Sequence, residues 1–138
     1  MGSDGIFPET IFNQAMHWNG TAWTQVTTPE PNGTSAGAHQ ELIFVTCKSG
    51  TNCWAVGDYG GASSPGFVLN QALHWDGGTW TLVDTPELGG AASGDTNNLR
   101  AVRCTSTTNC WAVGLAQSAG GSPFGQALRW NGTMWSAG

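Results

Sequence analysis

Positively charged residues are scarce in this chain. Charged side chains of both signs make up only 9% of its 138 residues, and the formal net charge is -5 at pH 7. A nucleic-acid interface needs clustered Lys and Arg to neutralise phosphates, and an anionic membrane surface attracts the same side chains. The composition therefore predicts neither a nucleic-acid partner nor attraction to anionic membranes. The cations are Lys48, Arg100, Arg103 and Arg129.

Long apolar runs are also missing. No stretch approaches the ~18 consecutive apolar residues of a membrane-spanning helix, so membrane insertion is not expected. The opening residues, MGSDGIFPET, contain neither a cationic segment nor an apolar core and do not resemble an export signal. Every window long enough for a helix is interrupted by Gly, Pro or β-branched residues. These features predict an all-β protein.

Catalytic sequence motifs are absent as well. The chain has no G-x-S-x-G elbow, no H-E-x-x-H zinc motif and no phosphate-binding loop. Among its histidines, His17 and His74 are equivalent repeat positions, and we expect them to pack or hydrogen-bond within the fold. His39 lies in a polar stretch and is expected to be a solvated loop residue. The chain is therefore predicted not to be an enzyme and to bind no metal or cofactor.

What the chain does contain is an internal repeat. One stretch occurs three times, as NQAMHWNGTAW, NQALHWDGGTW and GQALRWNGTMW, starting at Asn13, Asn70 and Gly125. A second stretch occurs twice, as TCKSGTNCWAVG from Thr46 and RCTSTTNCWAVG from Arg103. Equivalent positions lie 55 or 57 residues apart. Periods of this length indicate units that stack in a linear or radial array.

The four cysteines fall at the same place in the second stretch, as two local pairs. Cys47 is followed by Cys53, and Cys104 by Cys110. The intervening residues are typical of turns, so the cysteines of a pair should face each other on adjacent strands. We predict two disulfides within the repeats and an extracytoplasmic location. The alternatives are four free thiols in a cytosolic protein, or a zinc site, for which the spacing is unusual.

Each complete repeat offers four short β segments separated by turn residues. In the second repeat they are Leu42–Cys47, Cys53–Asp58, Val68–Trp75 and Thr79–Thr85.

The third segment alternates large and small side chains. Leu73 and Trp75 point to one face, and Ala72 and His74 to the other. This pattern predicts sheets stacked face to face, with large residues of one sheet over small residues of the next. We expect the equivalent tryptophans Trp18, Trp75 and Trp130 to be buried between sheets.

The C-W-A-V-G motif, followed by a loop, Q-A-L-H-W-D-G-G-T-W and a proline-ended strand, resembles the bacterial secreted β-propeller repeats related to kelch and Asp-box proteins. The resemblance implies four-stranded antiparallel blades, about two and a half per chain. Residues 1–38 would form a half blade, residues 39–95 and 96–138 the others, in one partial propeller domain.

The same resemblance assigns roles to repeated residues. In kelch-like blades a glycine ends the second strand, here Gly57 and Gly114, and a tryptophan opens the fourth. Asp76 stands at the hairpin position of an Asp box, but Asn19 and Asn131 replace it in the other copies. The upstream serine of an Asp box is also missing, which weakens an analogy with sialidases.

An incomplete ring leaves strand edges and apolar faces exposed, which soluble proteins avoid. The chain is therefore predicted to associate with itself, as a ring or a filament.

Aromatic rings beside Asn, Asp and Gln in Gly-rich loops are typical of carbohydrate sites, because sugar faces stack on rings and amides bind hydroxyls. For Trp23, Trp80 and Trp135 the competing interpretation is packing between blades. A paired-carboxylate hydrolase would instead need two of Asp58, Asp76 and Asp84 to converge. The candidate ligand-binding residues are Trp23, Trp80, Trp135, Asp58, Tyr59 and Gln117.

The sequence thus predicts a non-enzymatic, lectin-like β-propeller module, secreted or at the cell surface. It would recognise glycans or other surface groups and associate with copies of itself. Two alternatives stay open: a structural subunit of an extracellular ring or filament, and a fragment of a glycosidase-like propeller enzyme.

Overall fold

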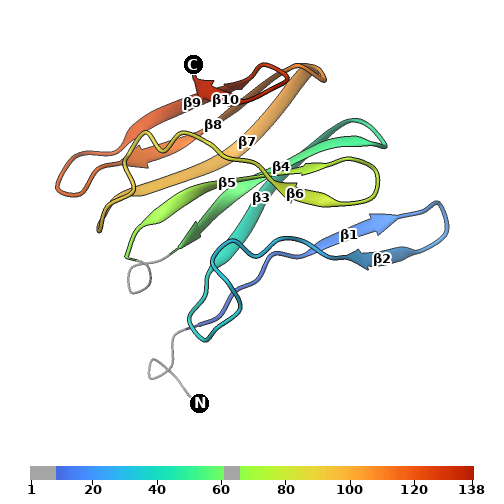
Figure 1. Ribbon diagram of the computed structural model, residues 1–138, viewed down its shortest axis with the longest axis horizontal. Helices are drawn as coiled ribbons and strands as arrows, with labels where there is room; N and C mark the ends of the chain where they lie inside the picture. Colours follow the sequence, from blue (N-terminus) through green and yellow to red (C-terminus); the bar gives the residue numbers. More distant parts are fainter. Residues whose placement is uncertain (1–8, 61–65) are drawn as a thin grey trace.

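The computed structural model describes residues 9–60 and 66–138, and the regular elements within these ranges are all β-strands, which confirms the predicted all-β class. The described part of the chain has no helix that is long and apolar enough to cross a membrane. The strands form an N-terminal hairpin, a first meander and a second meander (Figure 1). The hairpin contains β1 (Ala15–Trp18) and β2 (Trp23–Val26); the first meander contains β3 (Gln40–Ser49), β4 (Asn52–Gly60), β5 (Val68–Trp75) and β6 (Trp80–Leu82); the second meander contains β7 (Thr96–Ser106), β8 (Asn109–Gln117), β9 (Phe124–Trp130) and β10 (Trp135–Ala137).

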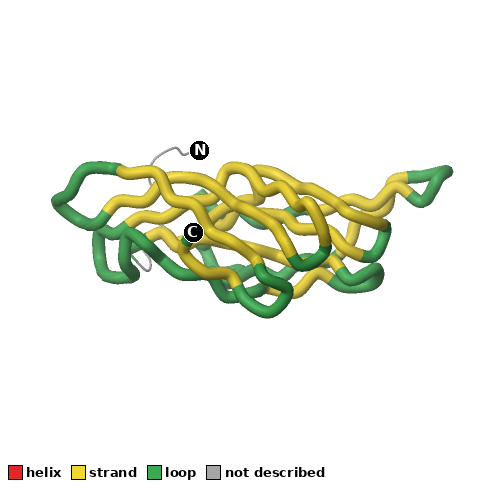
Figure 2. Tube along the Cα trace, turned by 90° about the horizontal axis from the view of Figure 1, so that it is seen from above, coloured by secondary structure: helices red, strands yellow, loops and turns green. Residues whose placement is uncertain are grey.

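Within the hairpin and each meander, consecutive strands pair antiparallel. The two meanders are joined by a parallel pairing of β5 with β7 at Val68 and Thr96, so their eight strands form one mixed sheet. Ile11 and His39 form the equivalent parallel bridge ahead of the first meander. The strands run along the length of the molecule, with turns at both ends (Figure 2).

The predicted strands agree with the observed ones in number and order. The third segment is correct to the residue, whereas β3 and β4 extend beyond the predicted limits on both sides. The fourth strand is shorter than predicted, because β6 ends at Leu82. Beyond it the chain turns back, and the side chain of Glu87 accepts a hydrogen bond from the backbone N–H of Asn70 at 2.7 Å.

The glycine of each C-W-A-V-G motif lies opposite a β-bulge. A Cβ atom at Gly57 would overlap the carbonyl oxygen of Glu41, and one at Gly114 would overlap that of Asn98. Only glycine allows two backbones to approach this closely. The repeated glycine is therefore required by the bulge.

Both predicted disulfides are present. Cys47 is bonded to Cys53 and Cys104 to Cys110, each pair directly opposite in the register of its hairpin. Closing such a short loop restricts the unfolded chain and contributes about 2 kcal/mol on the chain-entropy model. With all four thiols oxidised, the structure fits an oxidising environment and excludes the free-thiol and zinc alternatives.

The hydrophobic core lies between the two meanders, which pack face to face. Trp54 and Val56 of β4 are 1% and 0% exposed, and the Trp54 ring lies 4.8 Å from that of Trp130 and 5.0 Å from that of Trp135. Leu128 and Trp130, the large residues of β9, share this core with Ala72, a small residue of β5, in agreement with the stacking predicted for the third segment. The second meander supplies Leu99, Val102, Cys110, Ala112, Leu128 and Trp135 to this core.

The expected burial of one tryptophan per repeat is only partly correct. Trp75 is buried and Trp130 is half-buried, but Trp18 is 48% exposed, as is its neighbour Met16 at 51%. Among the described residues nothing packs on the outer face of the hairpin, so equivalent side chains have different environments. The most deeply buried tryptophan, Trp54, lies on β4, where the alternation of the third segment gave no signal.

Trp54→Ala should lower the free energy of unfolding by about 3 to 5 kcal/mol, because it opens a cavity between the sheets. Trp111 is the equivalent residue of the second meander and is 43% exposed, so Trp111→Ala is a matched control that should cost less than about 1 kcal/mol. Chemical denaturation of both variants measures the difference. Equal losses of unfolding free energy in the two variants would contradict the conclusion that Trp54 is buried between sheets and Trp111 is not.

Trp54→Phe separates packing from polarity. The indole N–H of Trp54 is buried and has no hydrogen-bond partner among the described residues, so phenylalanine removes an unsatisfied donor while keeping a ring. We expect a smaller loss than for Trp54→Ala in the same denaturation experiment.

Candidate functional site

The outer face of the second meander repeats the face that the first meander buries. Trp111 and Val113 of β8 stand where Trp54 and Val56 stand in β4, yet they are 43% and 47% exposed. Leu115 extends the same face of the strand. We call these three exposed residues, Trp111, Val113 and Leu115, the C-terminal face.

The opposite end of the molecule has a groove. A cavity of about 280 Å³ lies between the N-terminal hairpin and the first meander. Its meander side includes Leu42, Val45, Ala55 and Trp80, and its hairpin side includes Gln14. We call it the N-terminal groove.

A reciprocal pair of amides links each repeat to the next. Asn70 donates from Nδ2 to Oε1 of Gln126 at 3.1 Å, and Gln126 donates from Nε2 to Oδ1 of Asn70 at 2.9 Å. Asn13 and Gln71 make the equivalent pair. All four side chains are buried, so each amide depends on its partner for hydrogen bonds that water would otherwise supply. We call these contacts the interrepeat amide pairs.

Each glutamine of a pair also holds its own meander together. Nε2 of Gln71 donates to the carbonyl oxygens of Glu41 and Asp58, at 3.1 and 3.2 Å. Gln126 makes the equivalent bonds to the second meander, at 3.0 and 2.9 Å. One side chain thus binds the β-bulge of its own sheet and the asparagine of the preceding repeat.

Within the described residues, the terminal copies of the repeat lack one partner each for a further amide pair. The third copy of the repeat has Gly125 where the others have asparagine, so it offers no amide to a following unit. In the first copy, Gln14 is exposed and has no hydrogen-bond partner within the described ranges. The repeated Asn-Gln dipeptide was visible in the sequence, but its partner lies a full repeat away and was not predicted.

At the boundary between repeats, Asn97 and Gln40 occupy equivalent positions and make equivalent hydrogen bonds. Asn97 donates from Nδ2 to the carbonyl oxygens of Val68 and Gly90, and Gln40 donates from Nε2 to those of Ile11 and Gly33. Both side chains are fully buried. They hold the linker between repeats against the start of the parallel bridge.

Two carboxyl groups, the half-buried Glu87 and the buried Asp58, lie close to these contacts. Burial raises the pKa of Glu87 from 4.5 to about 7, although hydrogen bonds from Asn70 and Thr85 oppose the shift. Burial, and then the charge of Glu41, raise the pKa of Asp58 to about 6. Glu41 and Asp58 are directly opposite in the register of β3 and β4 and share a polar cleft of about 330 Å³ with Arg100.

Asp58 and Asp76, two of the three acids proposed for a hydrolase, do not form a pair. Asp58 is opposite Asn70 at the start of β5, whereas Asp76 follows the end of that strand, so the two lie at opposite ends of the meander. Asp76 instead accepts backbone hydrogen bonds from Gly78 and Thr79, which lower its pKa and hold the turn. Asp84 is exposed in the segment after β6.

The three tryptophans proposed for ligand binding occupy unlike environments. Trp23 is 62% exposed and lies 5.6 Å from Trp18. Trp80 is half-buried and lines the N-terminal groove. Trp135 is 4% exposed and packs against Trp54 in the core, so a ligand could not stack on its ring in this structure.

The other three candidates do not join them in one site. Asp58 and Tyr59 are consecutive in β4 and point to opposite faces of the sheet. Tyr59 is half-buried near Asp84 and Glu87, and burial raises its pKa. Gln117 ends β8 and donates to the carbonyl oxygen of Gly121 in its own loop.

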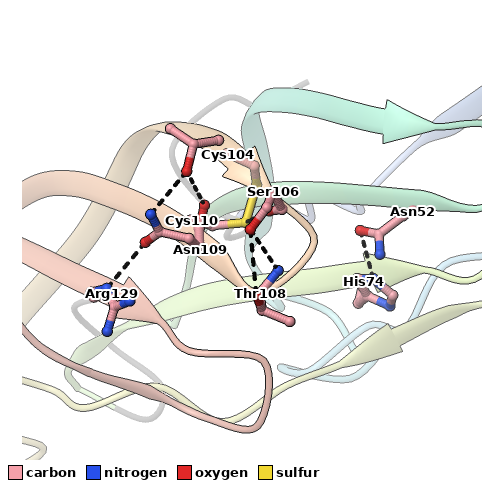
Figure 3. Close-up of a disulfide and its surroundings, with 9 residues drawn as sticks. Asn52, His74, Cys104, Ser106, Thr108, Asn109, Cys110 and Arg129 are labelled. Atoms are coloured by element: carbon pink, nitrogen blue, oxygen red, sulfur yellow. Dashed lines mark hydrogen bonds between the residues drawn. A yellow bond between two sulfur atoms is a disulfide. The ribbon is translucent and has the colours of Figure 1, made fainter.

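The repeated histidine position has a structural contact in both meanders. His74 hydrogen-bonds through Nε2 with Oδ1 of Asn52 at 3.2 Å, and Arg129, its equivalent, donates from Nε to Asn109 at 3.1 Å (Figure 3). His74 also lies 4.7 Å from the Trp54 ring. His39, expected to be solvated, is half-buried and hydrogen-bonds through Nδ1 with the carbonyl oxygen of Gly60.

No family model, curated protein or solved structure matches this chain. The described residues also contain no group of three or more His, Cys, Asp or Glu side chains placed to hold a metal ion. The resemblance to kelch-like and Asp-box repeats therefore stays a prediction that depends on the sequence motifs.

The interrepeat amide pair should contribute cooperatively to stability. Asn70→Ala and Gln126→Ala should each lower the free energy of unfolding by about 1 to 3 kcal/mol, because each leaves a buried partner unsatisfied. The double variant should lose less than the sum, with a coupling of about 1 kcal/mol or more. Gln14→Ala is the matched control and should change stability by less than about 0.5 kcal/mol. Strict additivity would show that the two amides act independently.

The raised pKa of Glu87 predicts that stability falls as pH rises from about 4.5 to about 7. Over that range the unfolded chain releases the proton and the folded chain retains it, so the unfolded state binds fewer protons. Glu87→Gln should reduce this decline, whereas Asp76→Asn, at a group with a lowered pKa, should leave it unchanged. Denaturation midpoints measured across this range test the point; an identical decline in Glu87→Gln would contradict it.

Proposed function

We propose that this chain is a non-enzymatic packing module of an extracytoplasmic β-propeller-type array, whose sheets stack face to face and whose ends associate with further β-sheets. The observation that carries the proposal is the equivalence of two surfaces. Trp54 and Val56 are buried where a following sheet covers them, and Trp111 and Val113 present the same chemistry without a cover among the described residues. Exposed apolar faces of this kind mark association surfaces.

The strand connections support the comparison with propeller blades. Each meander has four consecutive antiparallel strands, and the first meander lies between the hairpin and the second meander (Figure 1). Blades of this architecture bury their faces only against neighbouring blades. The two disulfides support a secreted or cell-surface location.

The use of the repeated polar residues supports a packing role over catalysis. The Asn-Gln dipeptide, the buried Gln40 and Asn97, and the His74 position all make hydrogen bonds within or between sheets. Carbohydrate recognition by one tryptophan per repeat has less support, because Trp135 lies in the core. Association of copies through the ends would be mainly apolar, since Gly125 supplies no amide to a following unit.

The experiment is sedimentation velocity at micromolar to millimolar protein concentration. We expect species heavier than 14.4 kDa whose fraction grows with concentration. Trp111→Asp combined with Val113→Asp should weaken the association, because two carboxylates would be buried in the contact. Thr34→Asp combined with Thr107→Asp adds the same charge at exposed positions outside the C-terminal face and serves as the control.

A stable 14.4 kDa species throughout would overturn association through the ends. Binding to a glycan array that survives the C-terminal substitutions and is lost in Trp23→Ala would favour the lectin-like alternative instead.

A further inference from the structure

The N-terminal hairpin is half of a unit that is complete elsewhere in the chain. The pairing of β1 with β2 has the register of β5 with β6, so Trp18 is opposite Trp23 as Trp75 is opposite Trp80. In the first meander the other edge of β5 pairs with β4 along its whole length. Within the described ranges, the corresponding edge of β1 has no strand beside it. An open edge of this kind can accept an added strand.

We call the side chains of the second meander that surround Trp54 and Val56 the socket. The N-terminal groove is an unfilled copy of this socket. In the core, those two side chains pack in a cluster with Leu99, Val102, Ala112 and Trp135. The groove is lined by the equivalent residues of the first meander, Leu42, Val45, Ala55 and Trp80.

Exposure confirms that this copy of the socket is open. Leu99 and Val102 are 0% and 1% exposed, whereas Val45, the equivalent of Val102, is 57% exposed. The internal copy therefore shows which side chains would fill the groove: a tryptophan and a valine from the second strand of a C-W-A-V-G hairpin.

The side chain of Gln14 in the N-terminal groove is a third indication that a hairpin can bind there. Gln71 and Gln126 each donate from Nε2 to two carbonyl oxygens of the first two strands of their own meander. Gln14 lines the groove and has no such acceptors among the described residues. A hairpin beside β1 would supply both carbonyl groups.

We propose that the N-terminal groove and the edge of β1 that is unpaired in the described residues form a docking site for a β-hairpin of the C-x5-C-W-A-V-G type from outside residues 1–138. The hairpin completes a four-stranded sheet with β1 and β2. Its tryptophan and valine enter the socket of the first meander, and one backbone carbonyl from each of its two strands accepts a hydrogen bond from Gln14. This inference deepens the proposed packing function by specifying the partner of one end.

A second copy of the chain is not the occupant. Each copy already pairs its C-W-A-V-G strands, β4 and β8, with the strands that follow them. Suppose that the C-terminal face of one copy entered the groove of a second copy. Strands β9 and β10 of the first copy would then need the space that β1 and β2 of the second copy already occupy. The site takes a hairpin that lacks its own third and fourth strands.

The probe is a synthetic peptide of residues 40–60 with its disulfide closed, added to the full chain at a concentration where sedimentation shows no association. We expect saturable binding by calorimetry and slower deuterium exchange of the amides of β1. A peptide with Trp54→Ala and Val56→Ala should bind at least about ten-fold more weakly. In the protein, Val45→Asp should abolish binding, Gln14→Ala should weaken it, and Trp111→Asp, at the other end, should leave it unchanged.

A second experiment uses a fused chain and does not depend on the isolated peptide folding as a hairpin. Residues 39–69 joined directly before Asn13 would complete the sheet in one polypeptide, with Val68 of the added segment in the place of Ile11. We expect a higher melting temperature than the parent and slower exchange of β1. A fused chain with unchanged stability and unprotected β1 amides overturns the proposal.

Two other results also overturn it. One is peptide binding that protects β8 and is lost in Trp111→Asp, which would place the peptide on the C-terminal face. The other is protection of β1 that grows with protein concentration in the absence of peptide, which would identify a second copy as the occupant. Because binding is measured on the unassociated protein, failure here leaves the test of self-association independent.

Discussion

Burial of the β4 face against the second meander is the contact on which the rest of the structure depends. A single four-stranded sheet has two faces and no second layer of its own, so its large side chains need a neighbouring sheet. Trp54 and Val56 find that layer in Leu99, Val102, Ala112 and their neighbours. Stability therefore resides between repeats, and the units at the two ends differ in environment from the one between them.

Apolar faces alone do not define how two sheets are aligned, because hydrophobic contacts are not directional. The interrepeat amide pairs supply direction. A reciprocal amide contact satisfies both buried groups in one alignment, and a displaced sheet would leave donors and acceptors without partners. Each glutamine also bonds the bulge carbonyl that the motif glycine allows to approach. The glycine, the bulge and the amide pair are thus parts of one arrangement.

The same arrangement gives the chain two unlike ends. The C-terminal face presents tryptophan and valine but no asparagine, because Gly125 replaces it. The N-terminal end presents a socket, a strand edge that is open within the described residues, and a glutamine, and the described residues contain only the last two strands of its unit. The two ends therefore differ in the partner surface that each would fit. Several polar residues of the repeats make hydrogen bonds within this packing.

The amino-acid sequence by itself determined what depends on near neighbours along the chain. Period-two alternation and turn residues define the strands, and short cysteine spacing across a turn determines both disulfides. Tertiary structure alone decided which equivalent residues are buried. Trp135 lies in the core and Trp23 in solvent, although both open the same strand of a repeat. The amide pairs join residues 56 and 58 positions apart, and Gln40 and Asn97 share one role without sharing a residue type. Such contacts depend on how one sheet lies on another, and no local pattern carries that information.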